Sequence, residues 1–352
     1  MVGRPLVSIL MPTHSRADVI GFAIESVLAQ TVEDFELIVV GDGCLPETGD
    51  VVGRYQDPRV RFLDLPKAPH FGYANRNAAL RESRGEIIGL AADDDLLFPD
   101  HLELLLKALE GGSALAYSQA LWVSTDGIAA PFLTNLEAAD ELDSFMTKGN
   151  TIAASCILYR ADSLPVRDPW PEDVPVAADW QLWRRIVGEN PHAPPSYCRT
   201  PTVLHFSAKR KNSRHSSASR LATYLEIADK ADWWPSPLRV KIPDGRTEQE
   251  VYADLMRADP IGWSSSIREA SDDLVARLAW DDISSIRPYL QKRIDEAKTL
   301  YYELVAARKQ LDATERSLLQ ANEALEEARS TATQLEKLVA DAGIKGGANE
   351  NG

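Results

Sequence analysis

Hydrophobic and polar positions alternate along the first third of the chain in a pattern that predicts strands and helices in turn. Short runs rich in apolar and β-branched residues, typical of buried strands, are separated by segments whose apolar residues recur at helical spacing. The expected strands are 6–11, 35–40, 59–65, 86–91 and 114–121, and the expected helices are 16–30, 46–56, 72–83 and 99–110. Strand–helix–strand units of this length indicate parallel strands with right-handed crossovers, and therefore an α/β sandwich of nucleotide-binding type.

From residue 122 onward the pattern is mixed. We expect a strand at 151–159, a helix at 178–187 and a last core strand at 197–206, followed by a basic polar loop at 209–215 and a helical region from Ser216. Prolines punctuate the next segment, because proline interrupts a helix interior. Residues 231–290 are therefore expected to form short helices separated by Pro235, Pro237, Pro243 and Pro260.

The C-terminal part has a heptad pattern. From Tyr289 to Ala340 the chain holds no proline and no glycine. One row of residues recurs every seven positions and a second lies three residues after it: Ala297, Leu304, Leu311, Leu318, Leu325, Ala332 and Val339, then Leu300, Ala307, Thr314, Ala321, Ala328 and Leu335. This narrow a/d seam between charged flanks favours a coiled coil, and so a homo-oligomer, over a long helix folded back on the globular part.

Together these patterns divide the chain into an α/β domain (1–215), a helical region (216–290), a coiled coil (291–341) and a disordered end (342–352). The net charge of −15 argues against non-specific binding to nucleic acid or anionic membranes. Cys44, Cys156 and Cys198 form neither a metal-ligand spacing nor a disulfide framework. No apolar run approaches the roughly 18 residues of a membrane helix, and no signal-peptide pattern precedes the first strand. We therefore expect a cytoplasmic protein.

An acidic run follows the expected strand 86–91. Asp93, Asp94 and Asp95 come directly after this apolar segment, and Pro99 then opens a helix. Clustered carboxylates raise one another's pKa unless a cation neutralises them, and the ends of parallel strands are where α/β sheets bind ligands. By itself the run is compatible with a metal site or with a solvated acidic turn.

Six short motifs occur in order between residues 6 and 207. They are VSILMPT (7–13) with Arg16, ESVLAQT (25–31), FELIVVGDG (35–43), NRN (75–77), GE (85–86) leading into DDD (93–95), and ADWQLW (178–183). In this order and at these intervals they resemble the family 2 glycosyltransferases of the GT-A fold. The resemblance implies a mostly parallel sheet flanked by helices, and transfer of a sugar from a nucleotide-diphosphate sugar, in the first place a UDP-sugar, to an acceptor hydroxyl.

The same resemblance implies roles in donor binding. Asp42 matches the strand-end residue that holds the base or ribose, and Thr13 and His14 match the residues that line the base pocket. We assign Arg16, from the first motif, to the same site.

Two positions depart from the family pattern and affect the expected nucleotide preference. Gly41 stands where an aspartate is usual, and His14 stands where an aromatic ring is frequent.

The resemblance also implies the chemical groups. Asp93 and Asp94 match the metal-binding pair, with Asp94 the more direct ligand of Mn²⁺ or Mg²⁺, and Asp179 matches the general base. The chemistry is consistent, because a departing diphosphate needs charge neutralisation and carboxylate oxygens suit hard divalent cations. A base that takes the acceptor proton in a single displacement inverts the anomeric centre. The residues alone would favour Asp179 as a helix N-cap.

Other side chains have more than one interpretation each. His205 is either a third metal ligand, or a group touching the diphosphate, or a structural histidine. Arg76, which we assign to the donor site, either reaches phosphate or pairs with a surface acid. The basic loop 209–215 either closes over the diphosphate or is solvated. Trp180 and Trp183 either form a sugar platform or, as their helical spacing favours, pack in the core.

For sugar transfer, a glycan, a lipid-linked glycan and a protein are all compatible acceptors. Two other functions compete with sugar transfer. A degenerate domain acting as a coiled-coil scaffold is favoured by Gly41 but not by the aspartates at positions 42, 93, 94 and 179. A sugar-nucleotide nucleotidyltransferase would need a glycine-rich loop after the first strand, and residues 12–16 contain no glycine.

Overall fold

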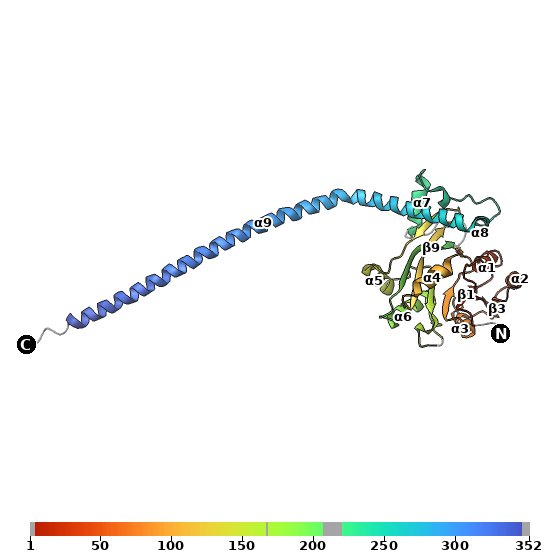
Figure 1. The fold of residues 1–352 in the computed structure, drawn as a ribbon, viewed down its shortest axis with the longest axis horizontal. Coiled ribbons are helices and arrows are strands. Elements are labelled where there is room, and N and C mark those ends of the chain that lie inside the picture. The colour runs from red at the N-terminus through yellow and green to blue at the C-terminus, as the bar shows by residue number, and fades with distance from the viewer. Residues whose placement is uncertain (1–3, 167, 207–219, 347–352) are drawn as a thin grey trace, which may run out of the picture. The chain divides into compact units, whose positions relative to one another are not determined.

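The computed structural model describes residues 4–166, 168–206 and 220–346. The chain forms two compact units, Met1–Arg277 and Leu278–Gly352. The first unit contains every described strand, and the second contains most of the C-terminal helix (Figure 1).

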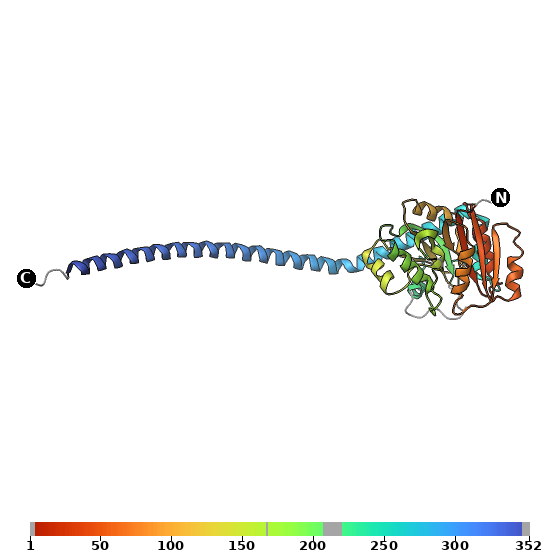
Figure 2. The same cartoon turned by 90° about the horizontal axis from the view of Figure 1, so that it is seen from below.

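The N-terminal half of the first unit is a parallel sheet. Strands β3, β2, β1 and β4 lie in that order, and each adjacent pair is parallel, with Val7 opposite both Phe35 and Ile87. Helices join successive strands and flank the sheet (Figures 1 and 2). The bounds are β1 Val7–Thr13, α1 Ile20–Leu28, β2 Phe35–Asp42, α2 Pro46–Val52, β3 Val60–Leu65, α3 Tyr73–Glu82 and β4 Ile87–Leu90. The predicted βαβ units are therefore confirmed.

The second half of the sheet is mixed. The full order is β3-β2-β1-β4-β8-β6-β9-β5, with β7 paired to β6, and only the β6–β9 pair of this half is parallel. The strands here are β5 Leu96–Leu97, β6 Leu115–Val123, β7 Ala129–Phe132, β8 Ile157–Arg160 and β9 Ser196–Phe206. The helices are α4 His101–Leu109, α5 Ala139–Thr147 and α6 Ala178–Glu189, with short 3-10 turns Ala154–Cys156 and Ala161–Ser163. The result is the predicted α/β class, a sheet flanked by helices.

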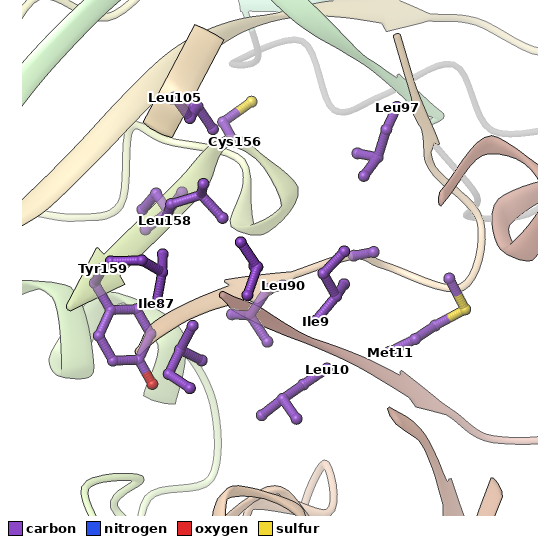
Figure 3. Packing of buried hydrophobic residues seen from close by; sticks show 14 of the residues in the cluster. Ile9, Leu10, Met11, Ile87, Leu90, Leu97, Leu105, Cys156, Leu158 and Tyr159 are labelled. Carbon is purple, nitrogen blue, oxygen red and sulfur yellow. The ribbon is translucent and has the colours of Figure 1, made fainter. Parts of the chain in front are cut away.

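Apolar runs from distant segments build the core where the two halves meet. Ile9 and Leu10 of β1, Leu90 of β4 and Leu158 of β8 are each at most 4% exposed. Figure 3 shows them among the buried side chains on these adjacent strands. Gly89 allows a close contact here, because a Cβ at this position would lie 2.7 Å from a Leu158 methyl carbon and would push that side chain away. These buried strands hold the acidic run after β4 in a fixed position.

Two expectations about local structure are wrong. The strand expected at 151–159 is confined to β8, because residues 154–156 form a 3-10 turn that brings Ser155 toward the acidic run. The short helices expected to 290 end earlier, at α8 Glu248–Ala258, and α9 then runs from Pro260 to Gly346. Pro260 does separate two helices, as expected, because it stands at the first position of α9, where a missing N–H has no cost, but the helix it starts is long instead of short.

The remaining described elements of the first unit are α7 Arg220–Lys230 and a 3-10 turn at Ser236–Leu238. The basic loop expected at 209–215 lies outside the described residues, as does most of the expected disordered end. In the second unit α9 continues through Pro288 as one helix with its leucines exposed. Among the described helices, none combines the length and apolar character needed to cross a bilayer.

Candidate active site

The carboxyl ends of β1, β2 and β4 meet at one edge of the sheet and open into a cleft of about 400 Å³. Thr13 at the end of β1 pairs with Gly41 of β2, so the polar residues that follow each strand come together. The cleft contains all six side chains assigned from sequence to the donor site, namely Thr13, His14, Arg16, Asp42, Arg76 and Asp93. Segments up to 80 residues apart in the chain thus form one surface.

Asp42 is the most heavily hydrogen-bonded residue of this cleft. Its carboxylate accepts hydrogen bonds from Lys67 Nζ (2.6 Å), Asn75 Nδ2 (2.8 Å) and the Ala68 backbone N–H (2.8 Å). His14 Nδ1 lies 2.7 Å from the Asp42 carbonyl oxygen. These contacts fix the Asp42 side chain at the cleft wall, so it can present a defined edge to a ligand.

Sequence reasoning missed Lys67 and gave Asn75 no role. Asn75 stands in the NRN motif, and its position next to Arg76 could have marked it as part of the site. Lys67 lies in a loop with no motif, and no sequence signal pointed to it. Gly72 also has a role that only geometry reveals: it has φ of +72°, and a Cβ there would lie 2.7 Å from the Asp42 carboxyl carbon. A side chain at this position would displace Asp42.

The acidic run lies at the edge of the cleft with its charge only partly compensated. Burial, with the nearby charges of Asp95 and Asp93, raises the pKa of Asp94 to about 7. Burial likewise raises the pKa of Asp93. The one ion pair of Asp94 in the described structure is with Arg16, at 3.1 Å. Carboxylates held with this excess of negative charge favour a cation, so Asp93 and Asp94 fit a hard divalent metal ion.

Asp95 does not share this metal-binding role, because other groups occupy its carboxylate. Its carboxylate accepts a hydrogen bond from Ser155 Oγ (2.6 Å), accepts another from the Phe206 backbone N–H (3.3 Å), and lies 2.9 Å from His205 Nδ1. It is 2% exposed. Asp95 therefore joins the acidic run to the turn before β8 and to the end of β9.

His205 is held at the end of β9 by this contact with Asp95. Within the ranges that the structure describes, no three His, Cys, Asp or Glu side chains are arranged closely enough to hold a metal ion. In the described geometry Asp93 and Asp94 lie at the cleft, and His205 contacts the acidic run through Asp95.

Arg76 lies in the cleft against two aromatic rings. Its Cζ is 5.0 Å from the centroid of Tyr73 and 4.8 Å from that of Trp170. Burial lowers the pKa of the Arg76 guanidinium, whereas the carboxylates of Asp179, Asp42 and Asp93 raise it. Its Nε is buried and has no hydrogen-bond partner among the described residues. A desolvated guanidinium with an unused donor is suited to an anionic ligand such as a phosphate.

Asp179 lies at the start of α6, and its electrostatic effect reaches Arg76 and Tyr73. The N-cap alternative is wrong: the N-cap is Ala177, with φ of +58°, and no side chain caps the helix. Asp179 Oδ2 instead accepts a hydrogen bond from Asn150 Nδ2 at 3.2 Å. The fold therefore brings a carboxylate from the second half of the chain close to the cleft residue Arg76.

The two tryptophans of α6 differ. Trp183 is fully buried and packs edge-on against Tyr159 and Trp170, so it belongs to the core. Trp180 donates from Nε1 to the Phe145 carbonyl oxygen and stacks with Arg184, whose Cζ is 4.7 Å from its ring.

Comparison with known proteins gives these observations a context. Residues 8–164 match the model of glycosyl transferase family 2. Over 128 residues the chain is 37% identical to a chondroitin synthase from Pasteurella multocida. The aligned part is 35% of this chain and 13% of that protein. Over 136 residues it is 33% identical to the succinoglycan biosynthesis protein ExoO of Rhizobium meliloti, covering 38% and 39% respectively. The chain thus spans less than half of the length of these relatives.

Among solved structures, S. aureus TarS 1–349 in complex with UDP-GlcNAc is similar with a TM-score of 0.46 and 19% identity, over 73% of this chain and 72% of that one. The mannosyltransferase PcManGT from Pyrobaculum calidifontis, in complex with GDP-Man and Mn²⁺, has a TM-score of 0.43 and 16% identity, over 82% and 84%. The family match covers the strands that form the cleft and the acidic run at its edge. Residues 8–164, which hold these strands and the acidic run, are therefore similar to glycosyl transferase family 2.

Proposed function

We propose that this protein transfers a sugar from a nucleotide-diphosphate sugar, in the first place a UDP-sugar, to an acceptor hydroxyl with inversion at the anomeric carbon. The observation that carries the proposal is the cleft itself. Asp42, Arg76 and Asp93 come from three separate segments and line one cavity, with the raised-pKa carboxyl of Asp94 beside it.

In this proposal the nucleoside lies in the part of the cleft formed by Thr13, His14 and Asp42. The Asp42 carboxylate, held by Lys67 and Asn75, accepts hydrogen bonds from the base or the ribose. Arg76 uses its free donors on the diphosphate, where a planar guanidinium binds well. The Tyr73 and Trp170 rings keep the Arg76 side chain in place.

A divalent cation fits the acidic run, because Asp93 and Asp94 are buried carboxylates whose pKa values are raised. We assign Asp94 as the principal ligand and Asp93 as its partner. His205, which is held on Asp95 at the end of β9, is a third candidate ligand that would have to move to reach the same cation. When bound, Mn²⁺ or Mg²⁺ would neutralise the charge that develops on the departing diphosphate. Arg16 holds the Asp94 carboxylate in place in the described structure.

Asp179 is the proposed general base. It would take the proton of the acceptor hydroxyl as that oxygen attacks the anomeric carbon from the side opposite the diphosphate. Asn150 fixes one carboxylate oxygen and so orients the other. A single displacement of this kind breaks the bond to the diphosphate oxygen, forms the new glycosidic bond and inverts the configuration.

The acceptor is proposed to be a growing glycan, since two of the relatives are named for polysaccharide synthesis. A lipid-linked or protein acceptor presents the same hydroxyl chemistry. We further propose a cytoplasmic protein in which two copies pair through the exposed heptad seam of α9.

The main support for the scaffold alternative was Gly41, and the packing around this residue gives the glycine another explanation. A Cβ at this position would lie 3.1 Å from a Phe62 ring carbon and 3.2 Å from Asp64 Oδ1. Val40 and Asp42 line the cleft, whereas Gly41 is not among its lining residues. The glycine therefore removes no side chain from the proposed donor site.

The deciding experiment is a thermal-shift and hydrolysis screen of the full chain with UDP-, GDP- and dTDP-sugars, with Mn²⁺ and with EDTA. We expect one nucleotide class to raise the melting temperature and to be hydrolysed slowly, and both effects to need the metal. If no donor binds and none is turned over, the proposal is wrong.

A further inference from the structure

The seam of α9 consists of large residues in one row and small residues in the other. Counting Leu304, Leu311, Leu318 and Leu325 as a positions, the d positions between them are Ala307, Thr314, Ala321 and Ala328. The four leucines are 50% to 67% exposed. The hydroxyl of Thr314 donates to the Gln310 carbonyl oxygen at 2.9 Å, so this residue can enter an apolar seam without an unpaired group.

These row compositions disfavour a parallel pair. In a parallel coiled coil a faces a′ and d faces d′, so leucine–leucine layers would alternate with alanine–alanine layers along the seam. The leucine layers would hold the helices apart, and the alanine layers would then leave voids. In an antiparallel pair each a position faces a d′ position, so a leucine can face an alanine in the same layer.

Charges select one antiparallel register. The e positions are Tyr301, Arg308, Glu315, Asn322, Arg329 and Glu336. In an antiparallel pair e faces e′, and a register centred on Asn322 places Arg308 opposite Glu336′ and Glu315 opposite Arg329′. A shift of one heptad either way instead brings Arg308 to Arg329′ or Glu315 to Glu336′, which are like-charge contacts.

The same register suits the core and the opposite edge. Its four central layers pair Leu318 with Ala328′ and Leu325 with Ala321′, together with their symmetry copies. The g positions near the centre are Ser317, Ala324 and Thr331, which are small and uncharged, so the backbones can approach on that side. In a parallel pair the e positions would face g′, where Glu303 with Arg308′ is the one pair of opposite charges.

We propose that two copies of this chain form an antiparallel coiled coil through residues 304–339 of α9, with Asn322 facing its own copy. The proposal rests on the pairing of two copies proposed above and adds its direction and register. The N-terminal unit of each copy is then joined to the opposite end of the pair. Residues 304–339 span about 54 Å of helix, which is several heptads of contact.

Single cysteines in the full chain test the direction. In the proposed register N322C faces itself and forms an interchain disulfide under mild oxidation. L318C faces Ala328′ and lies about 15 Å along the axis from its own copy, so it does not. E323C, one residue away and on the outer face, is the matched control. The wild-type chain measures any background from Cys44, Cys156 and Cys198, and mass spectrometry of digests assigns each linkage.

Charge exchange tests the register. E315R creates two like-charge contacts with Arg329′ and should weaken the dimer about tenfold, and R329E in the same chain should restore it. In a parallel pair neither change would matter, because residues 315 and 329 would face Gln310′ and Ala324′.

Light scattering of the full chain fixes the mass, and each outcome has one meaning. A dimer with N322C linked and L318C unlinked supports the proposal. A dimer with L318C linked and N322C unlinked overturns the direction but keeps the pairing. A monomer, or any larger oligomer, overturns both. Sugar transfer is assayed separately on the same samples, so a failure here is distinct from a failure of the proposed activity.

Discussion

His205 Nδ1 and Asp95 Oδ1 lie 2.9 Å apart, and this contact fixes the end of β9 to the acidic run after β4. The same carboxylate holds Ser155 Oγ and the Phe206 backbone N–H. Three adjacent aspartates therefore divide into two kinds. Asp95 is committed to the scaffold, and Asp93 and Asp94 are held toward the cleft with their charges incompletely compensated.

Ser155 tests this division. Its hydroxyl donates to Asp95 and accepts from the Ala92 backbone N–H at 2.9 Å, so it supports the acidic run from both sides. We expect S155A to lower the free energy of unfolding by about 1–3 kcal/mol, since a buried carboxylate loses a donor. Urea unfolding of the full chain measures this, and donor affinity should fall in parallel.

S163A is the matched control. Ser163 is also buried, but its hydroxyl has no hydrogen-bond partner among the described residues. We expect its free energy of unfolding to change by less than about 0.5 kcal/mol. Equal losses in the two variants would show that Ser155 acts only through packing.

Asp94 tests the metal assignment. We expect D94N to abolish metal-dependent nucleotide binding while leaving the fold intact, because the amide cannot replace an anionic ligand of a hard cation. Calorimetric titration with UDP and Mn²⁺ measures the binding, and circular dichroism checks the fold. D50N removes an exposed carboxylate on α2 and should bind as the wild type does. Metal-dependent binding that survives in D94N would remove Asp94 from the ligand set.

The pKa of Asp94 predicts a pH-dependent stability. Burial, with the charges of Asp95 and Asp93, raises it from 3.8 to about 7. Between these values the folded state binds more protons than the unfolded state, so the free energy of unfolding falls as the pH rises through this window. Without metal, D94N should therefore melt about 2–5 °C above the wild type at pH 8 and differ little at pH 4.

Melting curves in EDTA across this pH range measure the difference. Adding Mn²⁺ at pH 8 should raise the melting temperature of the wild type and not that of D94N. A difference between the two proteins that stays constant with pH would show that Asp94 titrates normally.

Much of this site could be predicted from the sequence, because its residues follow buried strands with strong apolar patterns. The parallel ends of β1, β2 and β4 bring Thr13, Asp42 and Asp93 together whatever the intervening loops do. Loop contacts were not predictable in the same way. Lys67 reaches Asp42 through a loop conformation that no local pattern encodes.

Two other misses have physical reasons. Pro260 separates α8 from α9 as expected, but the sequence pattern did not predict that the helix it starts would continue through Pro288 to Gly346. From the residues alone, an N-cap was the favoured interpretation of Asp179. The left-handed backbone at Ala177 begins α6 earlier, so the carboxylate stands inside the first turn and bonds to Asn150 instead.

The charge of Arg76 is expected to lower the stability of the fold while strengthening donor binding. Its guanidinium is desolvated, and its Nε lacks a partner in the described structure. R76M keeps an unbranched side chain against Tyr73 and Trp170 without the charge. We expect the free energy of unfolding to stay equal or to rise by about 1 kcal/mol, because an incompletely paired buried charge is costly. Donor affinity should fall by about tenfold or more. A stability loss with normal donor binding would make Arg76 a structural residue.

Asp179 separates donor binding from chemistry. D179N keeps the shape of the side chain and leaves an oxygen to accept the hydrogen bond from Asn150, but an amide cannot take a proton at neutral pH. We expect UDP binding with Mn²⁺ to stay within about twofold of the wild type and kcat to fall by about 10²–10⁴-fold. Calorimetry and steady-state assays with the donor found in the screen measure the two quantities.

The control for this variant is D173N, which removes an exposed carboxylate in the loop before α6. It should leave kcat unchanged, because no contact joins Asp173 to the cleft in the described structure. Loss of donor binding in D179N would mean that Asp179 acts by balancing the charge of Arg76, to which its electrostatic effect extends. Unchanged turnover would refute its role as the base, and the acceptor proton would then have to leave through another group near Arg76.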